Sequence, residues 1–176
     1  CYGLNGIGLL LKRRKLALEP LIHGGESTTI YRSGTPTVAL AASLETALEA
    51  AVGELPARTA RVKEANAFLR DALSRYPKVH INSPENAVPE VLNFSEMCIK
   101  SETMLAFLAE EQIYVSSASA CGRGQPSHTL AAMGRDPLAI DTAIRVSFCA
   151  DNTPEDVDAF LNRFEDGMKH LQRIKK

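Results

Sequence analysis

Apolar and polar positions change their spacing several times along the first part of the chain. A continuous apolar run at residues 7–11 ends at a basic cluster, which predicts a short buried strand, and residues 16–22 are a second extended candidate. The polar, irregular segment 23–36 is too long for a simple connection, and loops of this length are usually functional or disordered. From Thr35 and Pro36 onward, an alanine- and leucine-rich run predicts a helix with a hydroxyl N-cap, and Pro56 separates it from a second helical pattern.

Short strands and helices interleave in the second part of the chain. The strand candidates are residues 79–81, 91–94, 113–116 and 143–148. A helix is predicted over 101–111 with Ser101 as its cap, and an amphipathic helix closes the chain over 152–174, with Pro154 in its first turn, acids early and bases late. Without an internal repeat, this order predicts a small α+β layer, and residues 1–35 are expected to belong to a larger structure.

Composition and charge narrow the function classes. The chain has 176 residues, of which 45% are hydrophobic, so it can bury a core as one domain or a domain with an appendage. Because 20 Lys and Arg balance 21 Asp and Glu, no charge footprint indicates nucleic acid or an anionic membrane, and the basic cluster at 12–15 is interpreted as a solvated turn. The sequence contains no signal peptide or apolar span, which favours a cytoplasmic protein.

Four cysteines are spread along the chain, and one of them lies in an unusual setting. No CxxC pair or histidine at ligand spacing accompanies them, so the sequence predicts free thiols and no metal site. Cys121 lies in SSASACGRG, where the neighbouring residues are small or flexible apart from Arg123. Glycines would let this loop move, and a nearby cation favours the nucleophilic thiolate. A structural cysteine in a tight turn is the alternative.

Two further segments could bind anions. Arg145 lies in AIRVSF, a predicted strand with apolar neighbours, and its planar guanidinium suits either a substrate carboxylate or an internal Asp or Glu. Residues 32–36, RSGTP, precede a predicted helix, whose free N–H groups could bind a phosphate beside Thr35, although Thr-Pro also serves for capping alone.

Two histidines complete the candidate residues. His23 in HGG could lie near a site or be exposed. His128 is interpreted as a surface or capping residue.

Seven short motifs are more specific together than separately. They are YGLNGIG at 2–8, HGG at 23–25, RSGTP at 32–36, VLNFS at 91–95, SSASAC at 116–121, PSHTLAAMG at 126–134 and IRVSF at 144–148. In order and spacing they resemble the C-terminal half of the cysteine desulfurases related to NifS and IscS, which are class V, fold type I enzymes dependent on pyridoxal phosphate (PLP). The resemblance implies a small α+β domain plus the end of a three-layer α/β large domain.

The resemblance implies roles for individual residues. Cys121 matches the mobile-loop cysteine that attacks the sulfur of PLP-bound cysteine, leaves alanine and holds the sulfur as a persulfide. Arg145 matches the arginine that binds the substrate carboxylate. Thr35 matches a threonine that reaches the PLP phosphate of the partner subunit in a homodimer, and His23 lies in a loop near that site. The site loop would also include Arg32, Ser33 and Gly34.

The resemblance also predicts the organisation of the complete protein. Residues 1–35 would end the large PLP-binding domain, residues 36–76 would form a connecting helical arm, and residues 77–176 would form the small domain with the catalytic loop. The PLP lysine is expected just before residue 1, so we expect this chain alone to be inactive. L-cysteine would be the substrate, and a sulfur-acceptor protein, such as an iron–sulfur scaffold or a thiolation partner, would receive the persulfide sulfur.

Two departures and three alternatives accompany this interpretation. Leu4 and Asn5 stand where the family usually has proline and lysine, and the loop after Cys121 is shorter than in many relatives. A selenocysteine lyase or another class V PLP enzyme would have the same fold. A non-catalytic sulfur carrier or interaction domain would keep the thiol loop without the cofactor lysine.

Overall fold

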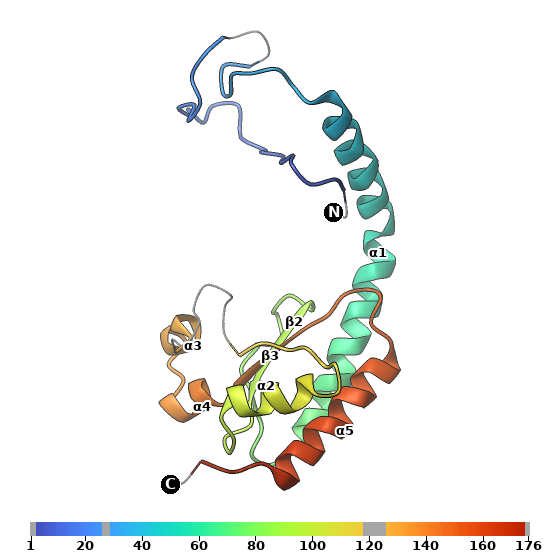
Figure 1. Ribbon diagram of the computed structural model, residues 1–176, viewed down its shortest axis with the longest axis vertical. Coiled ribbons are helices and arrows are strands. Elements are labelled where there is room, and N and C mark those ends of the chain that lie inside the picture. Colours follow the sequence, from blue (N-terminus) through green and yellow to red (C-terminus); the bar gives the residue numbers. More distant parts are fainter. Residues whose placement is uncertain (1–2, 26–28, 118–125, 175–176) are drawn as a thin grey trace. The chain divides into compact units, whose positions relative to one another are not determined.

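The computed structural model describes residues 3–25, 29–117 and 126–174. The chain divides into two compact units, Cys1–Leu55 and Pro56–Lys176, and helix α1 (Val38–Ser74) contributes to both (Figure 1). The division at residues 36 and 77 that the resemblance implies remains a prediction about the complete protein.

The first unit contains turns and extended segments that lead into the first part of α1. Residues 7–11 form no strand, and Leu9, Leu10 and Leu11 are 61%, 75% and 87% exposed, so the prediction of a buried strand is wrong for the described chain. A strand needs a hydrogen-bonded neighbour, and no described segment pairs with these residues. Residues 16–22 also form no strand. The basic cluster forms a turn in which Leu16 N–H donates to the Arg13 carbonyl at 3.0 Å.

Helix α1 differs from the sequence prediction at its start and in its continuity. Ala41 N–H donates to the Thr37 carbonyl at 3.1 Å, so Thr37 rather than Thr35 occupies the N-cap position. Pro56 lies inside one helix rather than between two. A proline removes one helical hydrogen bond, and the boundary between the two compact units falls directly before it. The buried positions of α1 all follow Pro56, at helical spacing: Val62, Asn66, Leu69 and Leu73.

The second unit contains a three-stranded antiparallel sheet in the order β1-β2-β3. The strands are β1 (His80–Ile81), β2 (Val91–Ser95) and β3 (Ala143–Ser147). Asn93 of β2 lies opposite Arg145 of β3. Residues 113–116 are predicted as a strand, but they meet the sheet by a single bridge: Arg145 N–H donates to the Ser116 carbonyl at 2.6 Å, and Ser116 N–H to the Arg145 carbonyl at 3.1 Å.

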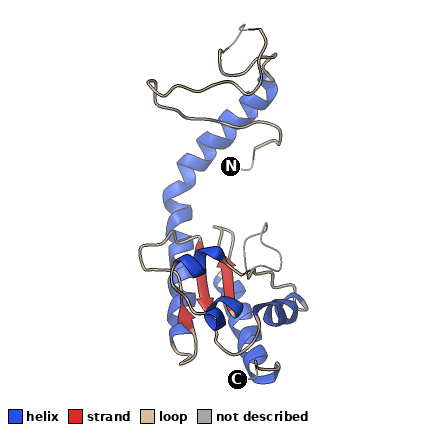
Figure 2. Ribbon diagram, turned by 90° about the vertical axis from the view of Figure 1, so that its left-hand side faces the viewer, coloured by secondary structure: helices blue, strands red, loops and turns tan. Residues whose placement is uncertain are grey.

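The hydrophobic core of this unit packs against one face of the three strands. Figure 2 shows these strands in red. Helices α2 (Ser101–Ala109) and α5 (Pro154–His170) contact each other beside the sheet. Phe94 of β2 meets Phe164 edge to face at a ring-centroid distance of 5.6 Å, and Phe160 stacks on Phe164 at 5.8 Å. Because the apolar side chains gather on this face, the opposite face carries the polar residues of the strands.

The starts of the last three helices follow the sequence closely. Thr153 forms a capping box with Asp156 at the start of α5, acids occupy its first turn and bases its last, so the predicted closing helix is confirmed. Helices α3 (His128–Ala132) and α4 (Pro137–Asp141) precede β3, and Ser127 Oγ and Asp136 Oδ1 accept backbone N–H groups at their starts. Gly134, with φ of 74°, follows α3 and adopts the left-handed backbone that favours glycine after a helix.

The start of α2 contains a buried acid instead of the predicted serine cap. Lys100 occupies the N-cap position without a side-chain hydrogen bond, and Ser101 is the first helical residue. The fully buried Glu96 side chain accepts N–H groups from Cys98, at 3.0 Å, and from Ile99. Burial raises the pKa of Glu96 from 4.5 to about 7, although these N–H groups and the charge of Arg173 oppose the rise.

The buried Glu96 predicts a stability that falls as pH rises. In the unfolded chain the carboxyl ionises at its ordinary pKa of 4.5, whereas in the folded chain it keeps its proton until about pH 7. The stabilisation is therefore complete below pH 4.5 and is lost as pH rises through about 7. We expect a loss of about 3 kcal/mol between these limits.

Thermal unfolding of the Glu96→Gln variant, followed by circular dichroism, checks this expectation. Glutamine keeps the shape and cannot ionise, so the Tm of the unaltered protein should fall relative to the variant from about pH 5 to about pH 8. Parallel pH profiles of the two proteins would contradict the assignment.

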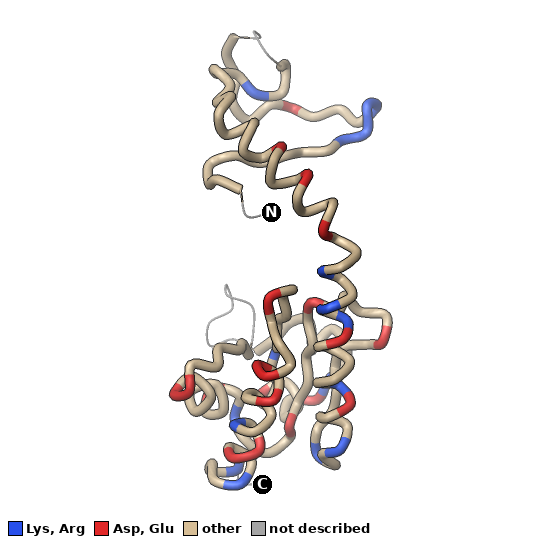
Figure 3. The backbone as a smooth tube through the Cα atoms, turned by 90° about the vertical axis from the view of Figure 1, so that its right-hand side faces the viewer, with Lys and Arg blue, Asp and Glu red and all other residues tan. Residues whose placement is uncertain are grey.

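Acidic and basic residues are mixed rather than segregated along the chain of the second unit (Figure 3). Three ion pairs join described residues: Asp71 with Arg75, Glu110 with Arg163, and Glu165 with Lys169. No helix within the described ranges is long and apolar enough to cross a membrane.

Candidate active site

Strand alternation places two polar side chains beside each other on the face of the sheet opposite the core. Phe94 and Ile144 are fully buried in the core. Successive side chains of a strand point to opposite faces, so the preceding residue of β2, Asn93, and the following residue of β3, Arg145, lie on the other face. The register makes these two residues direct cross-strand partners.

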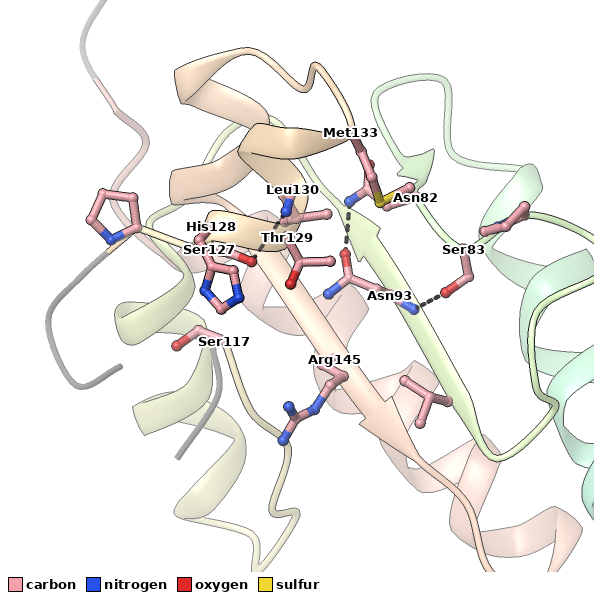
Figure 4. Close-up of a pocket in the computed structure, with 13 residues that line it drawn as sticks. Asn82, Ser83, Asn93, Ser117, Ser127, His128, Thr129, Leu130, Met133 and Arg145 are labelled. Atoms are coloured by element: carbon pink, nitrogen blue, oxygen red, sulfur yellow. Dashed lines mark hydrogen bonds between the residues drawn. The ribbon is translucent and has the colours of Figure 1, made fainter. Parts of the chain in front are cut away.

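This polar face borders a cavity of about 420 Å³ (Figure 4). The cavity lies between the sheet, the segment after β1 and helix α3. Eight of its thirteen lining residues carry a side chain with a hydrogen-bonding group. They are Asn82, Ser83, Asn93, Ser117, Ser127, His128, Thr129 and Arg145. Five apolar residues complete the wall, and such a combination of apolar surface with convergent polar groups suits a small molecule with a polar group.

Arg145 carries a guanidinium group without a partner in the described structure. Its Nε is buried and has no hydrogen-bond partner. No carboxylate of the described residues forms an ion pair with it, so the internal salt bridge considered from the sequence has no partner here. A buried, unsatisfied charged donor is costly unless a bound anion completes it. The side chain therefore has the chemistry of an anion-binding group facing a cavity.

Helix α3 brings a histidine to the same cavity. The sequence favours a surface or capping role for His128, but the cap of α3 is Ser127, whose Oγ accepts the Leu130 N–H at 3.3 Å. His128 is exposed, and it lies on the same side of the cavity as Ser117 (Figure 4). It is thus available as a hydrogen-bonding group at the cavity wall.

The HGG and RSGTP motifs of the first unit lie against each other. Ser33 donates its N–H, at 3.4 Å, and its Oγ–H, at 3.3 Å, to the Ile22 carbonyl. Gly24 has φ of 155°, and a Cβ at this position would lie 2.9 Å from Ser33 Oγ. A glycine is needed here because a side chain would collide with the RSGTP segment.

The exposed donors of this pair of motifs are suited to a phosphate group. His23, Arg32 and Thr35 are all exposed. Arg32 Nη1 donates to the Ser33 carbonyl at 2.8 Å, and Gly34, with φ of 107°, allows this close approach. The Thr35 hydroxyl forms no hydrogen bond within the described ranges, so its donor and acceptor capacity is unused there.

Cys121, the predicted nucleophile, lies outside the described residues. The described residues that flank its segment, Ser117 and Pro126, both line the cavity that contains Arg145. The two other cysteines that are described, Cys98 and Cys149, are free thiols, one buried and one exposed.

Comparison with known sequences identifies the class of protein. The profile of the family described as "Aminotransferase class-V" matches residues 1–160, and the chain belongs to this family. Within the class it is similar to a "NifS/IcsS protein homolog" of Lactobacillus delbrueckii subsp. bulgaricus and to "Cysteine desulfurase IscS" of Dictyoglomus turgidum, with 32% identity to each over 98% of this chain. The chain spans 46% and 45% of these proteins, which is less than half of their length.

Solved structures give the same result. A "NIFS-LIKE PROTEIN" matches 89% of this chain with a TM-score of 0.76 and 34% identity, and the match covers 40% of that chain. A NifS-like protein from Rickettsia africae matches 88% of this chain with a TM-score of 0.74 and 26% identity, over 41% of its own length. The resemblance to NifS- and IscS-related proteins and the α+β fold are therefore confirmed.

Sequence reasoning did not identify two polar residues of the cavity, Asn82 and Asn93. The motif VLNFS contains Asn93, and its alternation already places the asparagine on the face away from Leu92 and Phe94. Asn82 carried no comparable signal, because strand β1 is two residues long and the asparagine follows its end.

Proposed function

We propose that the complete protein is a PLP-dependent cysteine desulfurase that converts L-cysteine to L-alanine. The observation that carries this proposal is the Arg145 guanidinium, unpaired within the described structure, at a cavity that several other polar side chains also line. A planar guanidinium binds a carboxylate through two parallel hydrogen bonds, and every amino-acid substrate has such a group. The names of the relatives support cysteine as the amino acid.

In this proposal Cys121 is the nucleophile and Arg145 orients the substrate. The Cys121 thiolate attacks the sulfur of bound cysteine, the carbon–sulfur bond breaks, and its electron pair stays on the carbon side, which takes a proton to give alanine. The transferred sulfur remains on Cys121 as a persulfide. No external oxidant or reductant is needed. The position of Ser117 and Pro126 at the cavity wall supports this role, because they are the nearest described residues on either side of Cys121.

The residues at 32–35 fit the phosphate group of PLP in their chemistry. Thr35 offers an uncommitted hydroxyl, and Arg32 offers a cation beside it. We infer that Thr35 binds the phosphate of PLP held by a partner subunit, with Arg32, Ser33, Gly34 and His23 forming the surrounding loop. When bound, PLP takes up the electron pair released as the carbon–sulfur bond breaks.

The proposal extends to partners and location. The persulfide sulfur of Cys121 passes to an acceptor protein, either an iron–sulfur scaffold or a thiolation partner. A cytoplasmic location suits this chemistry, since a reducing compartment keeps the thiol free. The protein acts as a homodimer if Thr35 serves the partner's cofactor.

Alanine release from L-cysteine by the purified complete protein, loaded with PLP, tests the proposed function. We expect one alanine per sulfur transferred, with persulfide on Cys121 detected by mass spectrometry. The isolated 176-residue chain is the matched control and is expected to release none. If L-selenocysteine is cleaved while L-cysteine is not, the protein is a selenocysteine lyase, and the proposal is wrong.

A further inference from the structure

The backbone hydrogen bonds bring the side chains of Asn93 and Arg145 especially close. The N–H and C=O of Arg145 bond to Ser116, while the N–H of Asn93 donates to Ser83 Oγ at 2.9 Å and its C=O accepts from Asn82 at 2.8 Å. Neither backbone therefore bonds to the other, and the two residues form the non-hydrogen-bonded type of antiparallel pair. In this type the Cα atoms are only about 4.5 Å apart and the side chains are nearest.

A short relay of hydrogen bonds determines which end of the Asn93 amide faces the cavity. Ser95 Oγ lies 2.6 Å from the Ala139 carbonyl oxygen, and two oxygens at this distance must share a hydrogen, which the serine supplies. Ser95 Oγ can therefore only accept from Asn82, whose Nδ2 lies 2.8 Å away. This orients Asn82 so that Nδ2 also donates to Asn93 Oδ1 at 2.8 Å.

The opposite orientation of the two amides is unfavourable. Rotating Asn93 alone would set two NH₂ groups against each other, and rotating both would leave Ser95 Oγ with two acceptors and one hydrogen. The relay is buried, since Asn82 is 2% exposed and Ser95 is fully buried, so water does not compete for these groups. The relay leaves one acceptor unsatisfied, because Asn82 Oδ1 is buried without a hydrogen-bond partner in the described structure.

The relay leaves the Nδ2 of Asn93 as a donor at the cavity wall. This group forms no hydrogen bond with another described residue, and the side chain lies beside Arg145 in the cavity (Figure 4). Two neighbouring groups then offer donors only, the Asn93 amide and the Arg145 guanidinium. A carboxylate accepts only, and it has room for more hydrogen bonds than the two that a guanidinium fork makes.

We propose that Asn93 is a second substrate-binding residue, which donates a hydrogen bond to the carboxylate of the amino-acid substrate, and that Asn82 is a positioning residue that keeps the Asn93 amide turned toward it. This inference rests on the proposed function, in which Arg145 binds the same carboxylate. It makes the site selective for an amino acid over the corresponding amine.

The substitution Asn93→Asp in the PLP-loaded complete protein tests this role. Aspartate has the same shape and still accepts from Asn82, but it turns a negative oxygen toward the substrate. We expect KM for L-cysteine to rise by about 30-fold or more, and by about 10-fold for Asn93→Ala. Cysteamine is cysteine without its carboxylate. Its kcat/KM, or its competitive inhibition constant, should change by less than about 2-fold in these variants.

Two further variants separate a binding role from a structural one. Asn86→Asp introduces the same charge at an exposed residue outside the cavity and should leave both substrates unaffected. Asn82→Asp cannot donate to Asn93, so the Asn93 amide should rotate and KM for L-cysteine should rise about 10-fold with Asn93 still present. If Asn82→Asp does not fold, the Asn93 variants decide the question alone.

The outcomes distinguish this inference from the proposed function. If the unaltered protein does not desulfurate L-cysteine, the proposed function fails and the inference fails with it. The inference is overturned, and the proposed function stands, if the unaltered protein is active and the Asn93 variants have an unchanged KM for L-cysteine. The same conclusion follows if the variants weaken the use of L-cysteine and of cysteamine by the same factor.

Discussion

Replacement of Cys121 with alanine is expected to lower desulfuration of L-cysteine by more than about 1,000-fold, because the attacking atom itself is removed. Serine is the stricter test, since it keeps the size of the side chain while its hydroxyl remains protonated and is a poor acceptor of sulfur. Initial rates of alanine release measure the loss. Mass spectrometry of the protein after incubation with L-cysteine should show no persulfide in the segment that contains residue 121.

Cys149 provides the matched control for this experiment. It is an exposed free thiol of the same unit and does not line the cavity. Cys149→Ser should therefore retain the activity and the persulfide of the unaltered protein. An active Cys121→Ser protein, or a persulfide that moves with Cys149, would disprove the assignment of the nucleophile.

Arg145→Lys is expected to raise KM for L-cysteine by about 100-fold, with a smaller change in kcat. Lysine keeps the positive charge but cannot make the two parallel hydrogen bonds of a guanidinium. The change tests geometry rather than charge, because both side chains are cations at neutral pH. Steady-state kinetics of the PLP-loaded complete protein gives both constants.

Stability measurements separate this role of Arg145 from a structural one. Its guanidinium has no carboxylate partner within the described structure, so Arg145→Lys breaks no ion pair there, and the Tm should change by no more than a few degrees. A large fall in Tm together with an unchanged KM would mean that Arg145 serves the fold rather than the substrate.

Local patterns predicted the elements of the second unit well. The closing helix has a hydroxyl cap, an early proline and an ordered charge gradient, and these signals act within a few residues of each other. Strands β2 and β3 are β-rich runs whose alternation is visible in the sequence, and alternation also separates Arg145 from the core.

Features that depend on distant partners were not predictable in the same way. Residues 7–11 have the composition of a buried strand, but burial requires a neighbouring surface, and no described segment supplies one. Pro56 indicates a break, yet the helix continues through it. The amide relay from Ser95 to Asn93 joins residues whose relation depends on strand register and on Ala139, which lies far along the chain.

The bridge between Ser116 and Arg145 ties the chain that precedes residues 118–125 to strand β3. The Ser127 cap of α3 fixes the chain that follows them. Under the proposed function, we therefore expect a change of length between these two anchors to leave the position of the Arg145 backbone in the sheet unaltered.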